Sequence, residues 1–390
     1  MKPAEPSVVV SARGEERVRI GHPWIYRTDV ADVRAEGGDT VVVRNPRGRV
    51  VGRALFSDQS QITLRMLTVG DEPAGDALWR ARLASAIAFR QRLEIDATAF
   101  RLVHGEADLL PSLVVDQYDR YLVVQALSQG TARLLPLIVS LLQELVAPLG
   151  VLARHDVKVR RLEGLDETVT LLAGEVPEVV SVRDGRIAVD VDPWRGQKTG
   201  LFLDQRENRA AARVYARGRM LDGFSYHGAF ALQFADRCDE VVALDVSEDA
   251  VAQIRRNAAQ NGLANIEARC ANVFDALRNM ERSGERFDTI VLDPPAFAKS
   301  KDAVEKAYAG YKEINLRALK LLRPGGVLVT CSCSYNVDEG LFGQMVYDAS
   351  VDARARVAVI EKRMQARDHP VLLGVPETYY LKCFILRKLG

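Results

Sequence analysis

The sequence is poor in cysteine and histidine, and neither residue is spaced as a metal-ligand motif. Its 390 residues include five cysteines and five histidines. The cysteines are odd in number and sparse, and they lie at Cys238, Cys270, Cys331, Cys333 and Cys383. We therefore expect no disulfide framework, no zinc site and no other metal, as is typical of a protein in the reducing cytoplasm.

Long apolar runs and a strong charge of one sign are also missing. No run approaches the roughly 20 apolar residues of a membrane span, so we expect no membrane association. The start of the chain, Met1–Pro6, is polar and predicts no secretory signal. The net charge is only +1, whereas nucleic-acid-binding domains are often clearly basic. A local basic face or an ordinary solvated surface would both explain the arginines of the N-terminal region, which include Arg44, Arg47, Arg49, Arg53 and Arg65.

A chain of this length exceeds the size of a single core, so several domains are expected. Residues 1–72 contain short β segments separated by turns, which predicts a small β-barrel. Residues 73–190 combine helices expected at 77–94 and 131–147 with several strands, which indicates an α+β domain without a catalytic motif. The remaining residues, 191–390, form the third predicted domain.

Strands and helices alternate in the third domain from Gly218 onward. The expected strands are 219–222, 240–245, 287–293 and 326–331, the last preceded by a turn at 323–326. The expected helices are 229–237, 247–261 and 306–322. Alternation with apolar strands favours an α/β fold built on a parallel, doubly wound sheet.

Two loops of this domain carry acidic residues that suit a nucleotide. Asp222–Gly228 follows the first strand with a glycine-bearing loop, at the sheet edge where open α/β folds bind ligands. Asp245 ends the next strand, about 20 residues further on, where a carboxylate accepts both hydroxyls of a ribose. The alternative for Asp245 is a cap for the following helix. We favour ribose binding because the two features occur at this spacing.

A third strand would end near Cys270, between the strands 240–245 and 287–293, and this point and the end of the fourth strand, 287–293, offer further candidates. Asn272 or Asp275 is placed to contact an adenine, although a simple turn explains both residues nearly as well. Asp293-Pro294-Pro295 ends an apolar strand, and the two prolines give a stiff loop that can present Asp293 to a flat base. The alternative is a plain strand terminator.

A cysteine near these loops would add a nucleophile. Cys333 falls just beyond the carboxyl end of the fifth strand, where a thiolate of lowered pKa can attack a pyrimidine ring. Cys331 is expected within the strand. Isolated buried cysteines usually act as small hydrophobic residues, and we assign Cys238, Cys270 and Cys383 to that class.

Taken together, the motifs resemble those of a known family. The sequence is similar to the bacterial 23S ribosomal RNA cytosine-C5 methyltransferases that carry an N-terminal PUA domain and a central α+β domain. The resemblance covers nearly the whole chain, and its matching segments are Gly21–Tyr26, Gln197–Arg209, Asp222–Gly228, Asp245, Asp293–Phe297, Ser332–Ser334, Asp368–Pro370 and Tyr379–Lys382.

The resemblance implies a Rossmann-like class I methyltransferase domain with an antiparallel edge, S-adenosylmethionine as cofactor and RNA as substrate. The implied cofactor-binding residues are Phe202, Asp204, Arg206, Asp222, Phe224, Ser225, Tyr226, Gly228, Asp245, Asn272 and Asp293. Cys333 would add to C6 of a cytosine flipped from its stack, while Asp293 holds or protonates N3. The PUA-like domain would grip the RNA, and homodimer formation is left open.

The sequence departs from related patterns at two positions. Other RNA cytosine-C5 enzymes have a second cysteine after a proline where this chain has Ala296, and Asn272 stands where aspartate is common. The alternatives are methylation of an exocyclic amine of an RNA base, a non-catalytic RNA-binding assembly factor, and methylation of a small molecule. The sequence does not identify the nucleotide that is modified.

Overall fold

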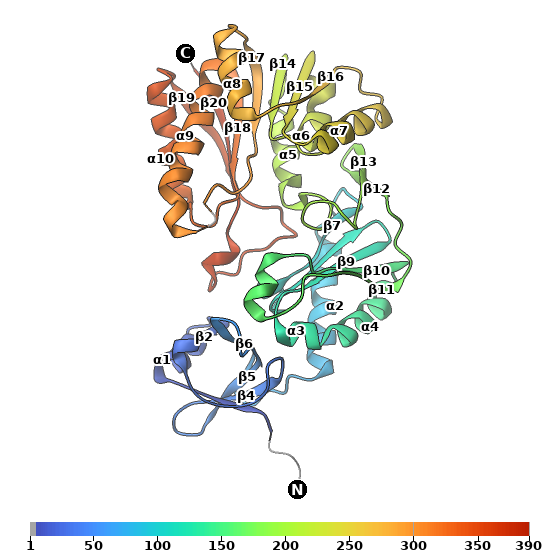
Figure 1. Cartoon of the computed structure of the whole chain (residues 1–390), viewed down its shortest axis with the longest axis vertical. Helices are drawn as coiled ribbons and strands as arrows, with labels where there is room; N and C mark the ends of the chain where they lie inside the picture. The colour runs from blue at the N-terminus through green and yellow to red at the C-terminus, as the bar shows by residue number, and fades with distance from the viewer. Residues whose placement is uncertain (1–4, 299, 390) are drawn as a thin grey trace. The chain divides into compact units, whose positions relative to one another are not determined.

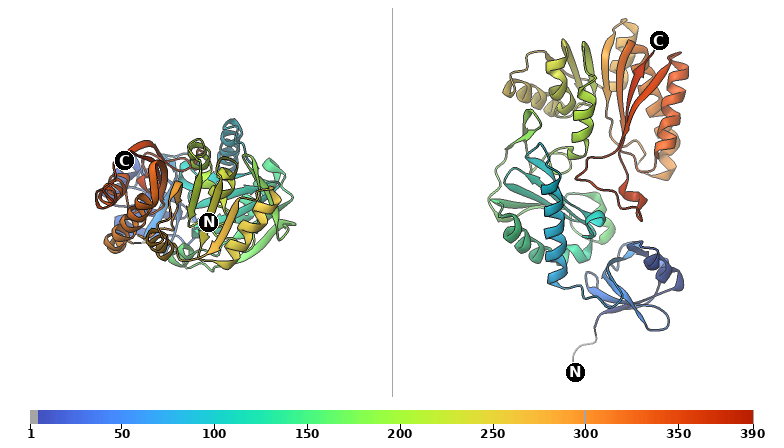
Figure 2. Two further views of the ribbon diagram at one scale, coloured as in Figure 1. Left: turned by 90° about the horizontal axis from the view of Figure 1, so that it is seen from above. Right: turned by 180° about the vertical axis from the view of Figure 1, so that it is seen from behind.

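A computed structural model describes residues 5–298 and 300–389. Residues 1–4 of the predicted N-terminal domain, and Lys299 and Gly390 of the third domain, lie outside the described residues. The chain divides into two compact units (Figures 1 and 2). The first comprises 1–182, 190–203 and 367–378, and the second comprises 183–189, 204–366 and 379–390.

The N-terminal part of the first unit is a six-stranded sheet with the order β2-β6-β5-β4-β1-β3. Its strands are β1 (Ser7–Val10), β2 (Trp24–Tyr26), β3 (Val30–Arg34), β4 (Thr40–Arg44), β5 (Val50–Phe56) and β6 (Ile62–Val69). The predicted β domain is therefore confirmed. Helix α1 (Ala12–Arg19) was not predicted, because its charged sequence buries only Gly14 and Val18 and shows no apolar period.

The central part of the first unit packs helices against a five-stranded sheet with the order β11-β10-β9-β8-β7. Its strands are β7 (Ala99–His104), β8 (Leu113–Tyr118), β9 (Tyr121–Ala126), β10 (Gly150–Arg154) and β11 (Val169–Gly174). Its helices are α2 (Asp76–Arg92), α3 (Gln129–Arg133) and α4 (Leu135–Val146). The single helix expected at 131–147 is wrong: Pro136 lies in the first turn of α4, where the missing N–H is tolerated, and a new helix begins there. A separate hairpin pairs β12 (Val180–Asp184) with β13 (Ile187–Val191).

The second unit is built on a seven-stranded sheet with the order β16-β15-β14-β17-β18-β20-β19. Its strands are β14 (Arg219–Gly223), β15 (Glu240–Asp245), β16 (Ile266–Cys270), β17 (Phe287–Leu292), β18 (Leu322–Ser332), β19 (Val357–Arg363) and β20 (Lys382–Lys388). Strands β14 to β18 pair in parallel, whereas β20 is antiparallel to both β18 and β19. The predicted α/β fold with an antiparallel edge is confirmed.

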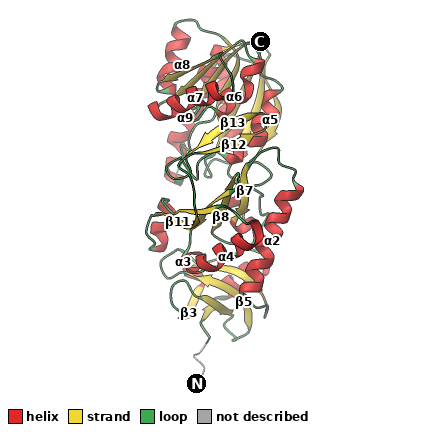
Figure 3. Cartoon of the chain, turned by 90° about the vertical axis from the view of Figure 1, so that its right-hand side faces the viewer, coloured by secondary structure: helices red, strands yellow, loops and turns green. Residues whose placement is uncertain are grey.

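Helices cover both faces of this sheet, as Figures 1 and 3 show. One face packs on α8 (Val273–Arg282), α9 (Val304–Leu321) and α10 (Glu339–Asp352), and the other on α5 (Arg206–Arg213), α6 (Ala229–Phe234) and α7 (Glu248–Gln260). Neighbouring strand residues alternate between the two cores, as Leu221 and Met220 do in β14. Apolar residues on both faces explain why these strands are easily read from the sequence.

The parallel strands bring their carboxyl ends to one edge of the sheet, and the loops that follow them carry the predicted site residues. One detail of this half was predicted wrongly. The turn expected at 323–326 lies within β18, opposite a register shift between Phe287 and Thr289. Gly325 has a φ of 77° there, which lets the strand continue through the irregularity.

Candidate active site

Asp222 is the penultimate residue of β14 and is only 1% exposed. Its Oδ2 accepts hydrogen bonds from Ser225 Oγ at 2.6 Å and from Ala231 N at 3.1 Å. Burial raises the pKa of Asp222 to about 7, and the charges of Asp293 and Asp245 act in the same direction. The other oxygen, Oδ1, is buried without a hydrogen-bond partner among the described residues. A buried acceptor in this state is costly unless a ligand supplies a donor.

The loop after β14 has an unusual backbone. Phe224, Tyr226 and Gly228 have φ values of 65°, 49° and 82°. Residues other than glycine rarely adopt this left-handed conformation, and where they do the surrounding structure holds them. Here Ser225 N donates to Leu244 O at 2.9 Å, which ties the loop to β15. The loop is thus held in one shape beside the buried carboxyl group of Asp222.

Asp245 ends β15 and accepts a backbone hydrogen bond at each oxygen. Oδ2 accepts from Tyr226 N and Oδ1 from Ser247 N, both at 2.9 Å. The N-cap of α7 is Ser247, whose hydroxyl accepts from Ala250 N, so Asp245 is not the cap. Each carboxylate oxygen keeps a second lone pair, so the group still has the acceptors that two ribose hydroxyls need.

Asn272 follows β16 and caps α8. Its side-chain oxygen accepts from Phe274 N at 3.0 Å and from Asp275 N at 3.4 Å. This geometry matches the turn that the sequence allowed, and it engages the oxygen of Asn272 rather than its NH₂ group. A contact between Asn272 and an adenine stays a prediction.

Three aromatic rings from different strand-end loops lie together at this edge. The ring of Phe224 is 6.2 Å from that of Phe274 and 6.4 Å from that of Phe297, with edge-to-face geometry. Phe274 and Phe297 are 5.9 Å apart. Phe274 was not predicted, because a single aromatic residue in a helical first turn carries no signal of its own. The cluster provides an apolar, aromatic surface against which a planar ring can pack.

Asp293 follows β17 and is held by a residue far away in the sequence. Its Oδ1 accepts from Gln205 Nε2 at 2.8 Å, and its backbone N lies 3.4 Å from Gly223 O. Gln205 is buried and immediately precedes α5. It was not among the predicted site residues, although it lies within the segment Gln197–Arg209 that matched the family.

The three predicted residues of that segment each have a partner in the protein. Lys198 Nζ lies 4.3 Å from the centre of the Phe202 ring, within the first unit. In the second unit, Asp204 accepts from the hydroxyl of Tyr380 at 2.8 Å, and Arg206 pairs with the neighbouring glutamate at 3.2 Å. These contacts hold the segment in place, and the assignment of the three residues to a cofactor stays a prediction.

Cys333 lies one residue beyond β18, as predicted. Its Sγ is 3.8 Å from Pro294 O, which places the thiol beside the Asp293 loop. The neighbouring Lys382 is 1% exposed, and its Nζ donates to Ser334 O at 2.7 Å and to Tyr380 O at 2.9 Å. Burial lowers the pKa of Lys382 to about 8, while the charge of Cys333 opposes that shift. A cation next to a thiol favours the thiolate.

The remaining cysteines have other environments. Cys331 and Cys383 are opposite each other on β18 and β20, and both are buried. Burial raises the pKa of Cys331 well above its ordinary value, so it stays a thiol. Cys238 is also buried. The expectation for Cys270 is wrong: it is exposed at the end of β16, because that strand lies at the edge of the sheet.

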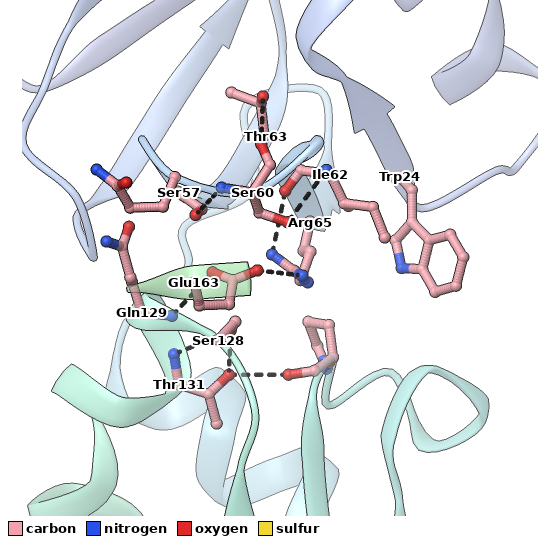
Figure 4. Close-up of polar contacts among 12 residues, drawn as sticks. Trp24, Ser57, Ser60, Ile62, Thr63, Arg65, Ser128, Gln129, Thr131 and Glu163 are labelled. Atoms are coloured by element: carbon pink, nitrogen blue, oxygen red, sulfur yellow. Dashed lines mark hydrogen bonds and ion pairs between the residues drawn. The ribbon is translucent and has the colours of Figure 1, made fainter. Parts of the chain in front are cut away.

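The N-terminal arginines do not form one basic face. Arg65 is buried, donates to Ile62 O at 3.1 Å and pairs with Glu163 at 2.7 Å (Figure 4). Arg65 therefore belongs neither to a basic face nor to a solvated surface, because a carboxylate far along the chain neutralises its guanidinium group. Arg47 and Arg49, in contrast, are exposed at the surface.

Two further expectations concern metals and membranes. Among residues 5–298 and 300–389, no group of three or more His, Cys, Asp or Glu side chains is arranged to hold a metal ion. No described helix combines the length and the apolar character needed to span a membrane.

Comparison with known families gives two matches that together cover most of the chain. Residues 8–69 match the PUA-like domain, and residues 101–361 match the S-adenosylmethionine-dependent methyltransferases. The chain is 41% identical over 381 residues to a ribosomal RNA large subunit methyltransferase I from Tolumonas auensis, covering 94% of this chain and 96% of the relative. A protein of the same name from Yersinia pseudotuberculosis is 37% identical over 390 residues, covering 97% and 98%.

Solved structures share the whole architecture. A SAM-dependent methyltransferase from Streptococcus mutans superposes with a TM-score of 0.82 at 19% identity, covering 98% of this chain and 99% of that one. A methyltransferase complexed with SAH gives a TM-score of 0.84 at the same identity and coverage. At this level of identity the likeness shows the fold.

Proposed function

The chain belongs to the S-adenosylmethionine-dependent methyltransferases, and we propose that it methylates C5 of a cytosine in the RNA of the large ribosomal subunit. The relatives from Tolumonas auensis and Yersinia pseudotuberculosis are named for the large-subunit RNA, and they align along nearly the full chain. The PUA-like domain at 8–69 suits an RNA partner. A ribosomal substrate also makes the cytoplasm the place of action.

Three domains would share the work on this substrate. Residues 1–72 would bind the RNA, and residues 73–190 would link this domain to the third one. Residues 191–390 would bind the cofactor and transfer the methyl group. The exposed arginines Arg47 and Arg49 are available to phosphates in this scheme, whereas Arg65 is not.

S-adenosylmethionine supplies an electrophilic methyl group when it is bound. The chain has groups that fit its polar parts. Oδ1 of Asp222, which has no hydrogen-bond partner in the described part of the chain, fits the amino group, and the acceptors of Asp245 fit the ribose hydroxyls. The aromatic cluster fits the adenine ring. The full set of proposed cofactor residues is Phe202, Asp204, Arg206, Asp222, Phe224, Ser225, Tyr226, Gly228, Asp245, Asn272 and Asp293.

Cys333 would act as the nucleophile on the target base. Its sulfur forms a bond to C6 of the cytosine, and the electron pair of the C5–C6 double bond moves through the ring to N3. N3 takes up a proton shared with Asp293, which leaves C5 nucleophilic. Lys382 supports this step by stabilising the thiolate. After methylation, a base or a water molecule takes the C5 proton, and the electron pair of the C5–H bond forms the C5–C6 double bond again and expels the thiolate.

The observation that carries the proposal is the position of Cys333 Sγ, 3.8 Å from Pro294 O and beside the buried ammonium group of Lys382. The test is Cys333→Ala in the full chain, with unmodified transcripts of large-subunit rRNA and labelled S-adenosylmethionine. We expect 5-methylcytosine formation to fall by at least about a thousandfold, because the covalent step is lost.

Cys270→Ala is the matched control, since Cys270 is exposed on the edge strand β16 and should leave the activity unchanged. Transcripts that contain 5-fluorocytosine should trap a covalent adduct with the wild-type chain but not with the Cys333 variant. Methylation of an exocyclic amine would survive Cys333→Ala, and that result would overturn the proposal.

A further inference from the structure

A chain of hydrogen bonds runs from an arginine on β19 to Asp293, and all its members lie in the second unit. Arg363 Nε donates to Asn208 Oδ1 at 3.2 Å, and Asn208 Nδ2 donates to Gln205 Oε1 at 2.7 Å. Gln205 Nε2 then donates to Asp293 Oδ1 at 2.8 Å. We call these four residues the amide relay. Asn208 and Gln205 are buried.

The chemistry of its first member fixes the direction of the amide relay. A guanidinium group is a donor only, so the atom of Asn208 that faces Arg363 has to be the oxygen. The NH₂ group of Asn208 then faces Gln205, which forces the oxygen of Gln205 toward Asn208. The NH₂ group of Gln205 is left for Asp293, and Oδ1 of that carboxyl group has to be an acceptor. Arg363 is itself anchored by Glu361, whose Oε2 accepts from Nη1 at 2.8 Å.

We propose that Gln205 is a positioning residue of the methyl-transfer site, which holds Oδ1 of Asp293 as an acceptor and leaves Oδ2 to exchange the proton with the target base. This inference rests on the proposed cytosine chemistry. When the sulfur of Cys333 adds to C6, the proton moves from Oδ2 to N3. When the thiolate leaves, N3 gives the proton back to Oδ2. The donor at Oδ1 stabilises the carboxylate that remains, so Asp293 is a stronger acid toward N3.

Several titratable groups face Asp293 from the neighbouring strands. Asp222 on β14 and Cys331 on β18 both interact with its charge, and both have raised pKa values. Cys333 lies beside the following proline. Each of these groups disfavours a negative charge on Asp293 when it is ionised, and the relay opposes them through Gln205.

The experiment compares Gln205→Leu and Gln205→Glu with the wild-type chain in the rRNA transcript assay, over a range of pH. Gln205→Leu removes the donor that stabilises the Asp293 carboxylate. The basic limb of kcat/KM, on which Asp293 loses its proton, should therefore move up by about one pH unit, and kcat should fall about tenfold because Asp293 is a weaker acid toward N3. KM for the transcript should stay within about threefold, because Gln205 acts through Asp293 and not by a contact of its own with the RNA. Gln205→Glu puts a second carboxyl group next to Asp293, so the two groups share one proton. The limb of kcat/KM that reports on Asp293 should then move further up in pH.

Gln233→Leu is the matched control. Gln233 is also a buried amide in the second unit, and its Nε2 donates to Asp184 O at 2.6 Å. If Gln205 had a purely structural role, the two leucine variants would behave alike. Both would have lower thermal stability, and the pH dependence of kcat/KM would stay where it is in the wild type. That result would overturn the inference.

A second measurement does not depend on activity. In a double-mutant cycle of Gln205→Leu and Asp293→Asn, thermal unfolding should show coupling between the two side chains at pH 8. Absence of coupling at pH 8 would contradict the relay. If the wild-type product is another methylated base, the cytosine proposal fails while the cycle still decides whether Gln205 acts on Asp293.

Discussion

Glu163 and Asp116 of the first unit and Asp222 of the second unit are carboxyl groups buried in opposite ways. Glu163 and Asp116 face guanidinium groups, in the pairs Arg65–Glu163 at 2.7 Å and Arg101–Asp116 at 2.6 Å. In the second unit, Asp222 accepts from a hydroxyl and a backbone N–H, with no cationic side chain paired to it among the described residues, and burial raises its pKa to about 7. A carboxylate paired with a guanidinium group already has its countercharge and serves to stabilise the fold. A carboxyl group held by neutral donors can still pair with a positively charged ligand.

The largest expected effect tests the paired side of this comparison. Glu163→Gln leaves the buried guanidinium group of Arg65 without a countercharge, and breaking a buried pair in this way costs about 3–5 kcal/mol. All three tryptophans, Trp24, Trp79 and Trp194, lie in the first unit, so denaturant unfolding followed by tryptophan fluorescence reports on this unit. The affinity for S-adenosylmethionine should change by less than about threefold.

The control for this prediction is Glu144→Gln, which breaks the exposed pair with Arg80. Exposed pairs contribute about 0–1 kcal/mol, so the unfolding midpoint should hardly move. Equal losses in the two variants would mean that the buried pair is no more than a surface contact. The claim that the buried Arg65–Glu163 pair stabilises the first unit would then be wrong.

The next effect tests the unpaired side. S-adenosylmethionine carries an ammonium group, and Asp222 is ionised only above its pKa of about 7. The affinity should therefore rise about tenfold, or about 1.4 kcal/mol, between pH 6 and pH 8. Asp222→Asn stays neutral and should bind with a flat pH dependence, equal to the wild type near pH 6 and weaker at pH 8. Calorimetry at several pH values measures both. An unchanged slope in the variant would show that Asp222 does not meet the ammonium group.

The same shift has a consequence for stability without the cofactor. The folded chain binds the Asp222 proton more tightly than the unfolded chain, because the folded pKa is the higher of the two. Stability is therefore lost as the pH rises from about 4 to about 7 through ionisation of this group. Asp222→Asn should remove that part of the loss, and the difference in melting temperature between variant and wild type should grow across this range.

The same contrast explains what could be predicted from the sequence. The strands of the second unit and the loops with Asp222, Asp245 and Asp293 have local signals, because apolar runs and chain spacing place them. Gln205 and Lys382 were missed as site residues, since they reach Asp293 and Cys333 only through tertiary contacts.

The sequence also led to wrong predictions of which side chains are buried and which are exposed. The environment of Arg65 depends on Glu163, which is 98 residues away in the sequence, so an arginine expected at the surface lies inside. Cys270 shows the reverse, because an edge strand exposes a residue that is usually buried. In both cases the side chain is ordinary and the partner or neighbouring strand decides its environment.

The smallest expected effect concerns Asn272. One end of its side chain is bonded within the protein, and the other end is proposed to contact the cofactor. Its oxygen serves the protein as the cap of α8, accepting from Phe274 N and Asp275 N. Its NH₂ group is the part that would donate to the adenine. Asn272→Asp keeps the cap, since aspartate is an equally good N-cap residue, so the melting temperature should not fall.

The same substitution replaces the NH₂ donor with an acceptor, and affinity for S-adenosylmethionine should fall about threefold, close to 0.6 kcal/mol. Asn272→Ala should lose this affinity and also about 1 kcal/mol of stability with the cap. If Asn272→Asp binds the cofactor as tightly as the wild type, the side chain of Asn272 serves only to cap α8. The adenine would then be held by the rings of Phe224, Phe274 and Phe297 without help from Asn272, because their cluster already offers an apolar, aromatic surface for it to pack on.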